Sequence, residues 1–170
     1  DRKLEKLLNH IGINEDNMQY FNNSYVNKVE IDKNNNTLNF IITMDNIPNI
    51  SVYNDVLNCL NHEFSSKTRL EFDCKKESYE NIKEYFEQII DNYAKDSARY
   101  NVFRNRNIEV NNNEIIFKVF NKIEEINIKN IENDIIKKLN NYGFKNIKLS
   151  TLLETTPEEE ILQKIEADKK

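Results

Sequence analysis

The densest group of side chains that could act on a charged ligand lies between residues 95 and 106. It contains four cations and an aromatic ring, namely Lys95, Arg99, Tyr100, Arg104 and Arg106. Three of the five arginines of the chain fall within residues 99–106. Because cations contact phosphates and aromatic rings stack on bases, this basic strip could hold a single nucleic-acid strand. The alternative is a connector whose arginines are merely solvated.

Two cysteines and a histidine are the candidates for metal or nucleophilic chemistry. Cys59 and His62 are three residues apart on a predicted helix, and Cys74 lies on the strand that follows. They could supply three zinc ligands, or a nucleophile with its base. However, no fourth ligand has a matching spacing, and Cys74 continues the apolar alternation of Leu70 and Phe72. Buried cysteine is common in such positions, so we expect no metal, no cofactor and no catalytic residue in this chain.

The overall composition narrows the class of protein further. The 170 residues carry a formal net charge of -5, whereas a general nucleic-acid coat is normally basic. Two glycines in the whole chain argue against a phosphate-binding loop built from backbone N–H groups.

The apolar runs are too short for a membrane span, and no secretory signal is expected. Two cysteines do not make a disulfide framework, so a reducing, cytoplasmic setting fits best.

Apolar periodicity divides residues 1–75 into elements that could position side chains. The predicted order is a helix over 1–11, strands at 29–31 and 38–44 joined by a turn at 34–36, a helix from Ser51 to Phe64, and a strand at 70–74. The helices follow the i, i+3, i+4 spacing of one apolar face, and the strands alternate apolar with polar residues. Ser51 is the expected N-cap of the second helix, because its hydroxyl can accept a hydrogen bond from a free backbone N–H.

Residues 76–153 repeat the same order. The predicted elements are a helix that Ser78 caps and that continues or kinks to about Phe103, strands at 108–110 and 115–119 around a turn at 111–113, a helix over 128–139 that Gly143 ends, and a strand at 147–149. Ile108 lies 79 residues after Val29, and Ile115 lies 77 residues after Leu38. We therefore predict an α+β fold of two similar αββαβ units, residues 1–75 and 76–153, each a small three-stranded sheet with helices packed on it. The alternative is a chance match, because Ile and Asn are so frequent here.

The last segment, residues 154–170, differs in composition from both units. Its six acids and three lysines give it a charge of -3, and it has few apolar residues. Thr156 before Pro157, with Glu159 following, is typical of a helix start. We expect an acidic, solvated helix or a linker that leads toward domains beyond it.

An αββαβ unit is similar to the type II KH architecture, which holds nucleic acid with a Gly-x-x-Gly loop. Neither unit contains that loop, since the two glycines are Gly12 and Gly143. A KH-like second unit would lack the usual contact with nucleic acid, which favours protein binding.

Ile41, Ile116 and Phe120 are apolar residues on strand faces that we expect to be exposed, and they could mark a partner surface. The alternative for them is burial on both faces of a sheet or between the units.

Several segments together resemble a known family. They are the strand at 29–32, the hairpin strand at 38–42, the helix from Tyr53 to Leu60 with Glu63 and Phe64 after it, and the segment 140–144 before the last strand. Their order and spacing resemble the N-terminal region of PolC, the replicative DNA polymerase III α subunit of low-GC Gram-positive bacteria, over residues 1–153. The 30 Asn, 22 Ile and 19 Lys residues agree with a low-GC source.

The resemblance implies a parent that is a DNA-directed DNA polymerase with a 3′–5′ exonuclease, whose OB and catalytic domains lie C-terminal to this region. It also implies a second domain similar to the KH-like domain of the clamp-loader subunit τ, with a role in interactions. None of the polymerase or exonuclease carboxylates falls in this chain. Our first hypothesis is therefore a non-catalytic module that recruits another replisome protein, such as τ. A weak contact with single-stranded DNA through the basic strip is the second, and a small stand-alone enzyme is the third.

Overall fold

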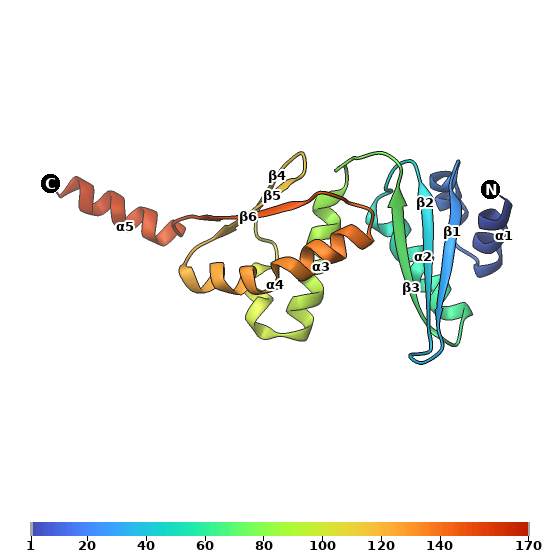
Figure 1. The fold of residues 1–170 in the computed structure, drawn as a ribbon. Coiled ribbons are helices and arrows are strands. Elements are labelled where there is room, and N and C mark those ends of the chain that lie inside the picture. The colour runs from blue at the N-terminus through green and yellow to red at the C-terminus, as the bar shows by residue number, and fades with distance from the viewer. Residues whose placement is uncertain (1, 170) are drawn as a thin grey trace.

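The computed structural model describes residues 2–169 and contains two sheets, each with helices packed on it (Figure 1). The first unit comprises α1 (Arg2–Ile11), the 3-10 helix η1 (Glu15–Phe21), β1 (Tyr25–Asp32), β2 (Thr37–Met44), α2 (Ile50–Glu63) and β3 (Lys67–Cys74). The second comprises α3 (Ile82–Asp96), the 3-10 helix η2 (Ala98–Phe103), β4 (Ile108–Asn111), β5 (Glu114–Val119), α4 (Lys122–Asn141) and β6 (Lys148–Leu153). The last helix, α5 (Pro157–Asp168), projects away from both sheets at one end of the molecule (Figure 1).

Both sheets have the same strand order and the same strand directions. In the first, β1 pairs antiparallel with β2, and β2 pairs parallel with β3. The strands β4, β5 and β6 repeat this arrangement. An antiparallel hairpin needs only a short turn, whereas a parallel pair needs a long crossover, which α2 and α4 provide. The predicted α+β fold of two three-stranded sheets with packed helices is confirmed.

Alternation along the strands builds the core. The buried strand residues are Phe40, Ile42, Met44, Leu70 and Phe72 in the first sheet, and Ile115, Phe117, Val119 and Leu149 in the second. They face the apolar sides of the helices, such as Leu4 and Leu8 of α1 and Ile135 and Leu139 of α4. Since a slip of one residue would expose every one of these side chains, the hydrophobic pattern fixes the register of both sheets.

The edge strand β1 departs from this pattern. Residues 27–32 are all exposed, including Val29 and Ile31 at 41% and 67%. The register places Val29 opposite Phe40 and Ile31 opposite Leu38, so both side chains point to the helix side of the sheet. Their exposure means that the helices leave this corner of the sheet uncovered.

Asparagine takes the backbone positions that glycine takes in most proteins. Among the residues that the structure describes, the positive-φ residues other than glycine are all Asn, namely Asn23, Asn36, Asn81, Asn105, Asn112 and Asn146. Asparagine tolerates the left-handed region because its short amide side chain can form hydrogen bonds locally. Asn36 and Asn112 lie in the two hairpin turns that the Asn runs predict, and both turns are confirmed.

The predicted cap of α2 is wrong. The helix begins after Asn49 rather than after Ser51. The backbone N–H of Ile50 donates to the carboxylate of Glu84 at 2.8 Å, and Glu84 belongs to α3 of the other unit. A carboxylate at a helix N-terminus is favourable because it satisfies a free N–H and complements the helix dipole. This capping contact comes from outside the local sequence.

The predicted cap of α3 is also wrong. The helix begins after Asn81, which has a left-handed backbone, instead of after Ser78. The side chain of Asn81 donates to the backbone carbonyl of Ile47, at 3.2 Å. The start of α3 is therefore set by a contact with the first unit.

A buried aromatic cluster joins the two units. The rings of Tyr53 in α2, Tyr85 in α3 and Tyr142 after α4 have centroids 4.7–6.2 Å apart. The hydroxyl of Tyr85 donates to the carbonyl of Pro48 at 2.8 Å, and that of Tyr53 donates to the carbonyl of Leu70 at 2.7 Å. Burial raises the pKa of both phenols, so they remain neutral donors. The cores of the two units therefore form one continuous apolar cluster.

The helix start predicted at Thr156 is present. Thr156 and Glu159 form a capping box, Pro157 occupies the first turn, and no residue of α5 is buried. The exposed apolar side chains of α5 are Ile161, Leu162 and Ile165. Within residues 2–169, no helix is both long enough and apolar enough to cross a membrane.

Gly143 of the second unit lies against Ile47 and Phe72 of the first, and we expect Gly143→Ala to lower the free energy of unfolding by about 3 kcal/mol. Its φ is +104°, and an added Cβ would lie 3.0 Å from Ile47 Cδ1 and 3.1 Å from the carbonyl oxygen of Phe72. Gly12→Ala is the matched control, because Gly12 also has a positive φ but has no neighbouring atom within 4 Å of the added Cβ. The control should lose only about 1 kcal/mol from backbone strain. Urea denaturation measures both, and equal losses would contradict the close approach at Gly143.

Candidate functional site

The open face of the second sheet carries the candidate site. Helices α3 and α4 lie on the opposite side of this sheet (Figure 1). In the register, Glu109 is opposite Ile116, and Lys118 is opposite Leu152. Side chains alternate along a strand, so these four share the face that is turned away from the core. We call this surface the outer-face patch and define it as Glu109, Ile116, Lys118, Phe120, Leu152 and Glu154.

Three apolar side chains of the patch are partly exposed. Ile116 and Phe120, two of the predicted partner residues, are half-buried, and Leu152 is 45% exposed. Ile116 and Phe120 therefore each keep part of their surface exposed on this face of the sheet.

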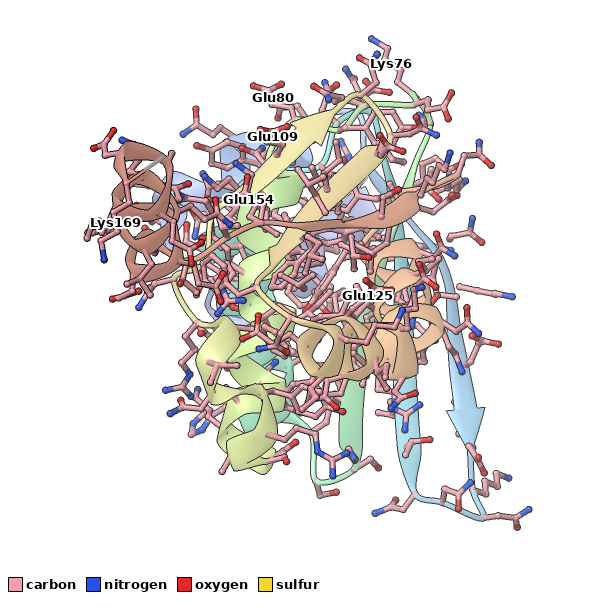
Figure 2. All side chains as sticks on the ribbon, turned by 90° about the vertical axis from the view of Figure 1, so that its left-hand side faces the viewer. Lys76, Glu80, Glu109, Glu125, Glu154 and Lys169 are labelled. Atoms are coloured by element: carbon pink, nitrogen blue, oxygen red, sulfur yellow. The ribbon has the colours of Figure 1, made fainter. Side chains whose placement is uncertain are left out.

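A lysine lies between two carboxylates on this patch. Lys118 Nζ is 3.4 Å from an oxygen of Glu109 and 3.4 Å from an oxygen of Glu154. The negative charge of Glu154 is the main reason why the pKa of Lys118 is raised. Figure 2, which views the molecule from the α5 end, shows Glu109 and Glu154 close together beside the sheet. Lys118 lies on the central strand between Ile116 and Phe120, so the patch combines apolar side chains with charges that are already ion-paired.

One end of the patch continues into a hollow of about 380 Å³. Its lining includes Arg104 and Arg106 from the predicted basic strip, together with Lys118, Phe120 and Glu154. The structure thus brings part of the basic strip and one predicted partner residue to the same place, although they were predicted as two separate sites.

Arg106 is held inside the fold. Its guanidinium forms an ion pair with Glu124, and the two side chains are 11% and 14% exposed. It also donates to the carbonyl of Val102 at 3.1 Å. Its Cζ lies 4.4 Å from the ring centroid of Phe120 and 5.4 Å from that of Phe103. Such a guanidinium stabilises the fold and is poorly placed to reach a phosphate.

The other residues of the basic strip differ in their burial and in their contacts. Arg104 Nε is 3.7 Å from a carboxylate oxygen of Asp91. The ring of Tyr100 packs against two neighbouring rings of α3 and η2. Lys95 and Arg99 are exposed, and no ion pair within residues 2–169 involves them. Nucleic-acid binding through this strip stays a prediction, now centred on Lys95 and Arg99.

Ile41 lies on the corresponding face of the first sheet. It is half-buried and stands between Lys28 and Glu71 in the register. The neighbouring Asn39 donates to Glu30 at 3.0 Å and to Glu71 at 2.9 Å. Because Ile41 is surrounded by polar side chains that already bind one another, this face has less apolar surface than the outer-face patch.

The cysteines and the histidine lie in unrelated surroundings. The thiol of Cys59 contacts a backbone carbonyl after α1, and burial raises its pKa, so it remains a protonated, weak nucleophile. Cys74 is buried, and its Sγ is 3.2 Å from the carbonyl of Asp45 and 3.0 Å from that of Lys76. His62 is exposed. In the part of the chain that the structure describes, no three His, Cys, Asp or Glu side chains are grouped to hold a metal ion.

Sequence reasoning identified only two of the six residues of the outer-face patch, Ile116 and Phe120. The last strand was predicted to end at residue 149, whereas β6 continues to Leu153. Leu152 was therefore not assigned to a sheet face, and neither was Glu154. Residues 149–153, Leu-Ser-Thr-Leu-Leu, do not alternate apolar with polar residues, so they offer only a weak strand signal.

Two family models match the chain. The model described as DNA polymerase III polC-type N-terminus I matches residues 3–74, and the one described as DNA polymerase III polC-type N-terminus II matches residues 84–170. Because the two matches cover most of the residues, the chain belongs to the N-terminal region of PolC-type DNA polymerase III, and the predicted resemblance is confirmed. The chain matches no curated protein and no solved structure.

Proposed function

We propose that this region is a non-catalytic interaction module of the replicative polymerase, and that its outer-face patch binds another replisome protein in the cytoplasm. The clamp-loader subunit τ is the first candidate partner. One observation carries the proposal: Ile116, Phe120 and Leu152 are left partly uncovered on an open sheet face. The family match supports a role in DNA replication.

The chemistry of the patch favours binding over catalysis. Protein interfaces combine apolar contacts with satisfied polar groups, and here Ile116, Phe120 and Leu152 lie beside the ion pairs of Lys118 with Glu109 and Glu154. Acid–base catalysis would need two carboxylates in different environments, with one of them desolvated. Glu109 and Glu154 instead share one lysine on an open surface.

The test is a calorimetric titration of this chain with purified τ from the same genome, at moderate salt. We expect saturable binding by the wild type. The double variant Ile116→Asp/Leu152→Asp should bind at least about tenfold more weakly, because two charges would replace two of the apolar side chains of the patch. Leu162→Asp is the control, since it adds a charge at a leucine of α5 that is also exposed, at 61%, and its affinity should not change.

Folding of the variants is checked by circular dichroism and urea denaturation. If the double aspartate variant does not fold, Ile116→Ser/Leu152→Ser is used in its place, and it should also weaken binding. Unchanged affinity in a folded double variant would exclude the outer-face patch as the binding site.

A single-stranded oligonucleotide serves as the second ligand, since the exposed Lys95 and Arg99 support a phosphate contact. Binding to the oligonucleotide alone, falling steeply with added salt, would replace our proposal with a nucleic-acid role. That binding should then disappear in Lys95→Ala/Arg99→Ala. Arg106 is left intact in this variant because its removal would disturb the fold.

A further inference from the structure

We propose that two copies of this chain pair through their β1 strands. The strands would run antiparallel about a two-fold axis at Val29 and join the two first sheets into one of six strands. The pairing goes beyond the proposed function and uses a different surface. It rests on the exposure of the edge, on the charges along it and on its apolar corner.

The edge of β1 is available for pairing. β1 is an outer strand of its sheet, and residues 27–32 are all exposed. An edge strand presents unpaired backbone N–H and C=O groups that can bind another strand. The irregularity between Val26 and Lys28 ends the regular part of β1 on one side, and the hairpin turn ends it on the other. This leaves a short, straight section centred near Val29 and Glu30.

The charges on this section are complementary to themselves. With the axis at Val29, Lys28 of one copy lies opposite the partner's Glu30, and the partner's Lys28 lies opposite Glu30. Lys28 and Glu30 are already 3.9 Å apart within one chain, and Asn39 holds Glu30 from the neighbouring strand at 3.0 Å. Pairing would therefore create a group of four charges that alternate in sign across the junction, and opposite charges on facing strands are stabilising.

The apolar side chains also match about this axis. Val29 would lie opposite the partner's Val29, and Ile31 would lie diagonal to it, on the corner that the helices leave uncovered. These two residues are 41% and 67% exposed in the single chain. The neighbouring register, with its axis at Glu30, would place two glutamates directly opposite each other, which is destabilising. The charges therefore select the axis at Val29.

Disulfide cross-linking tests the register. In a Cys59→Ser background, Val29→Cys should form a covalent dimer under mild oxidation, because opposite Cα atoms of antiparallel strands are about 4.5–5.5 Å apart, within reach of a disulfide. Ile31→Cys is the matched control, since the two introduced thiols would lie about 13 Å apart along the strands. Equal cross-linking of the two variants, or none in Val29→Cys, would overturn the proposal.

Charge exchange tests the pairing itself, with sedimentation equilibrium as the measurement. Lys28→Glu should raise the dissociation constant of the dimer by about tenfold or more, because it places like charges opposite each other in both halves of the junction. Lys28→Glu/Glu30→Lys should return it to nearly the wild-type value, since the charges would again be complementary. Failure of the exchange to restore pairing, or a wild type that remains monomeric up to about 1 mM, would overturn the proposal.

Discussion

Arg106→Ala is expected to lower the free energy of unfolding by about 3 kcal/mol, even though Arg106 lies in a strip that resembles a nucleic-acid contact. The Arg106 guanidinium and the Glu124 carboxylate are mostly buried against each other, and Glu124 also accepts a hydrogen bond from the N–H of Phe120 at 2.9 Å. Removing the cation leaves a desolvated carboxylate without its partner, which is the costly way to break such a pair. Urea denaturation followed by far-UV circular dichroism measures the loss.

Two further variants distinguish the loss of the Arg106–Glu124 ion pair from a general effect of mutation. Arg106→Met/Glu124→Leu removes both charges while keeping most of the volume, and it should recover most of the lost stability. Arg99→Ala removes an exposed arginine of the same strip and should change stability by less than about 0.5 kcal/mol. A loss in Arg106→Ala no greater than that in Arg99→Ala would contradict the structural role of Arg106.

The same pair gives the stability a dependence on acid. Burial acts to raise the pKa of Glu124, but the hydrogen bonds from Arg106 and from the N–H of Phe120 outweigh it, so the pKa is lowered overall. A glutamate with a lowered folded pKa contributes stability above its unfolded pKa of about 4.3, and that contribution is lost as the pH falls through the folded pKa. Arg106→Met/Glu124→Leu should therefore lose less stability than the wild type between neutral pH and pH values below about 4.

Elements that depend on local physics could be predicted from the sequence. The alternation of Phe40 with Ile42, and of Ile115 with Phe117, predicts strands whose burial the structure confirms. The Asn runs predict hairpin turns because asparagine tolerates a left-handed backbone, and Asn36 and Asn112 adopt it. The repeated order of elements predicts two similar units, because the same patterning rules apply to each half of the chain.

Features that depend on distant contacts could not be predicted. The cap of α2 comes from Glu84, which lies 34 residues beyond the N–H that it binds. Arg106 was predicted as a ligand contact because the sequence does not show that Glu124, 18 residues away, pairs with it. The pairing of β6 with β5 continues past the predicted strand end at residue 149 to Leu153, so Leu152 and Glu154 of the outer-face patch could not be named in advance.

Tyr85→Ala is the second change for which we expect a large effect, a loss of about 4 kcal/mol in the free energy of unfolding. The ring is fully buried, and its centroid lies 6.2 Å from that of Tyr53, 4.7 Å from that of Tyr142 and 5.2 Å from that of Phe144. Truncation would leave a cavity between the units and would remove the donor that satisfies the buried carbonyl of Pro48. Urea denaturation measures the loss, with circular dichroism as the probe.

Two companions identify what the ring and the hydroxyl each contribute. Tyr85→Phe keeps the ring and should lose only about 1 kcal/mol, the cost of leaving the Pro48 carbonyl without its donor. Tyr20→Ala removes a tyrosine that is 41% exposed and should have little effect. Because Tyr85 contacts residues from both units, its truncation should also broaden the unfolding transition as the two cores become less strongly coupled. A loss equal to that of Tyr20→Ala would instead mean that other contacts, such as the paired amides of Asn54 and Gln88, hold the units together.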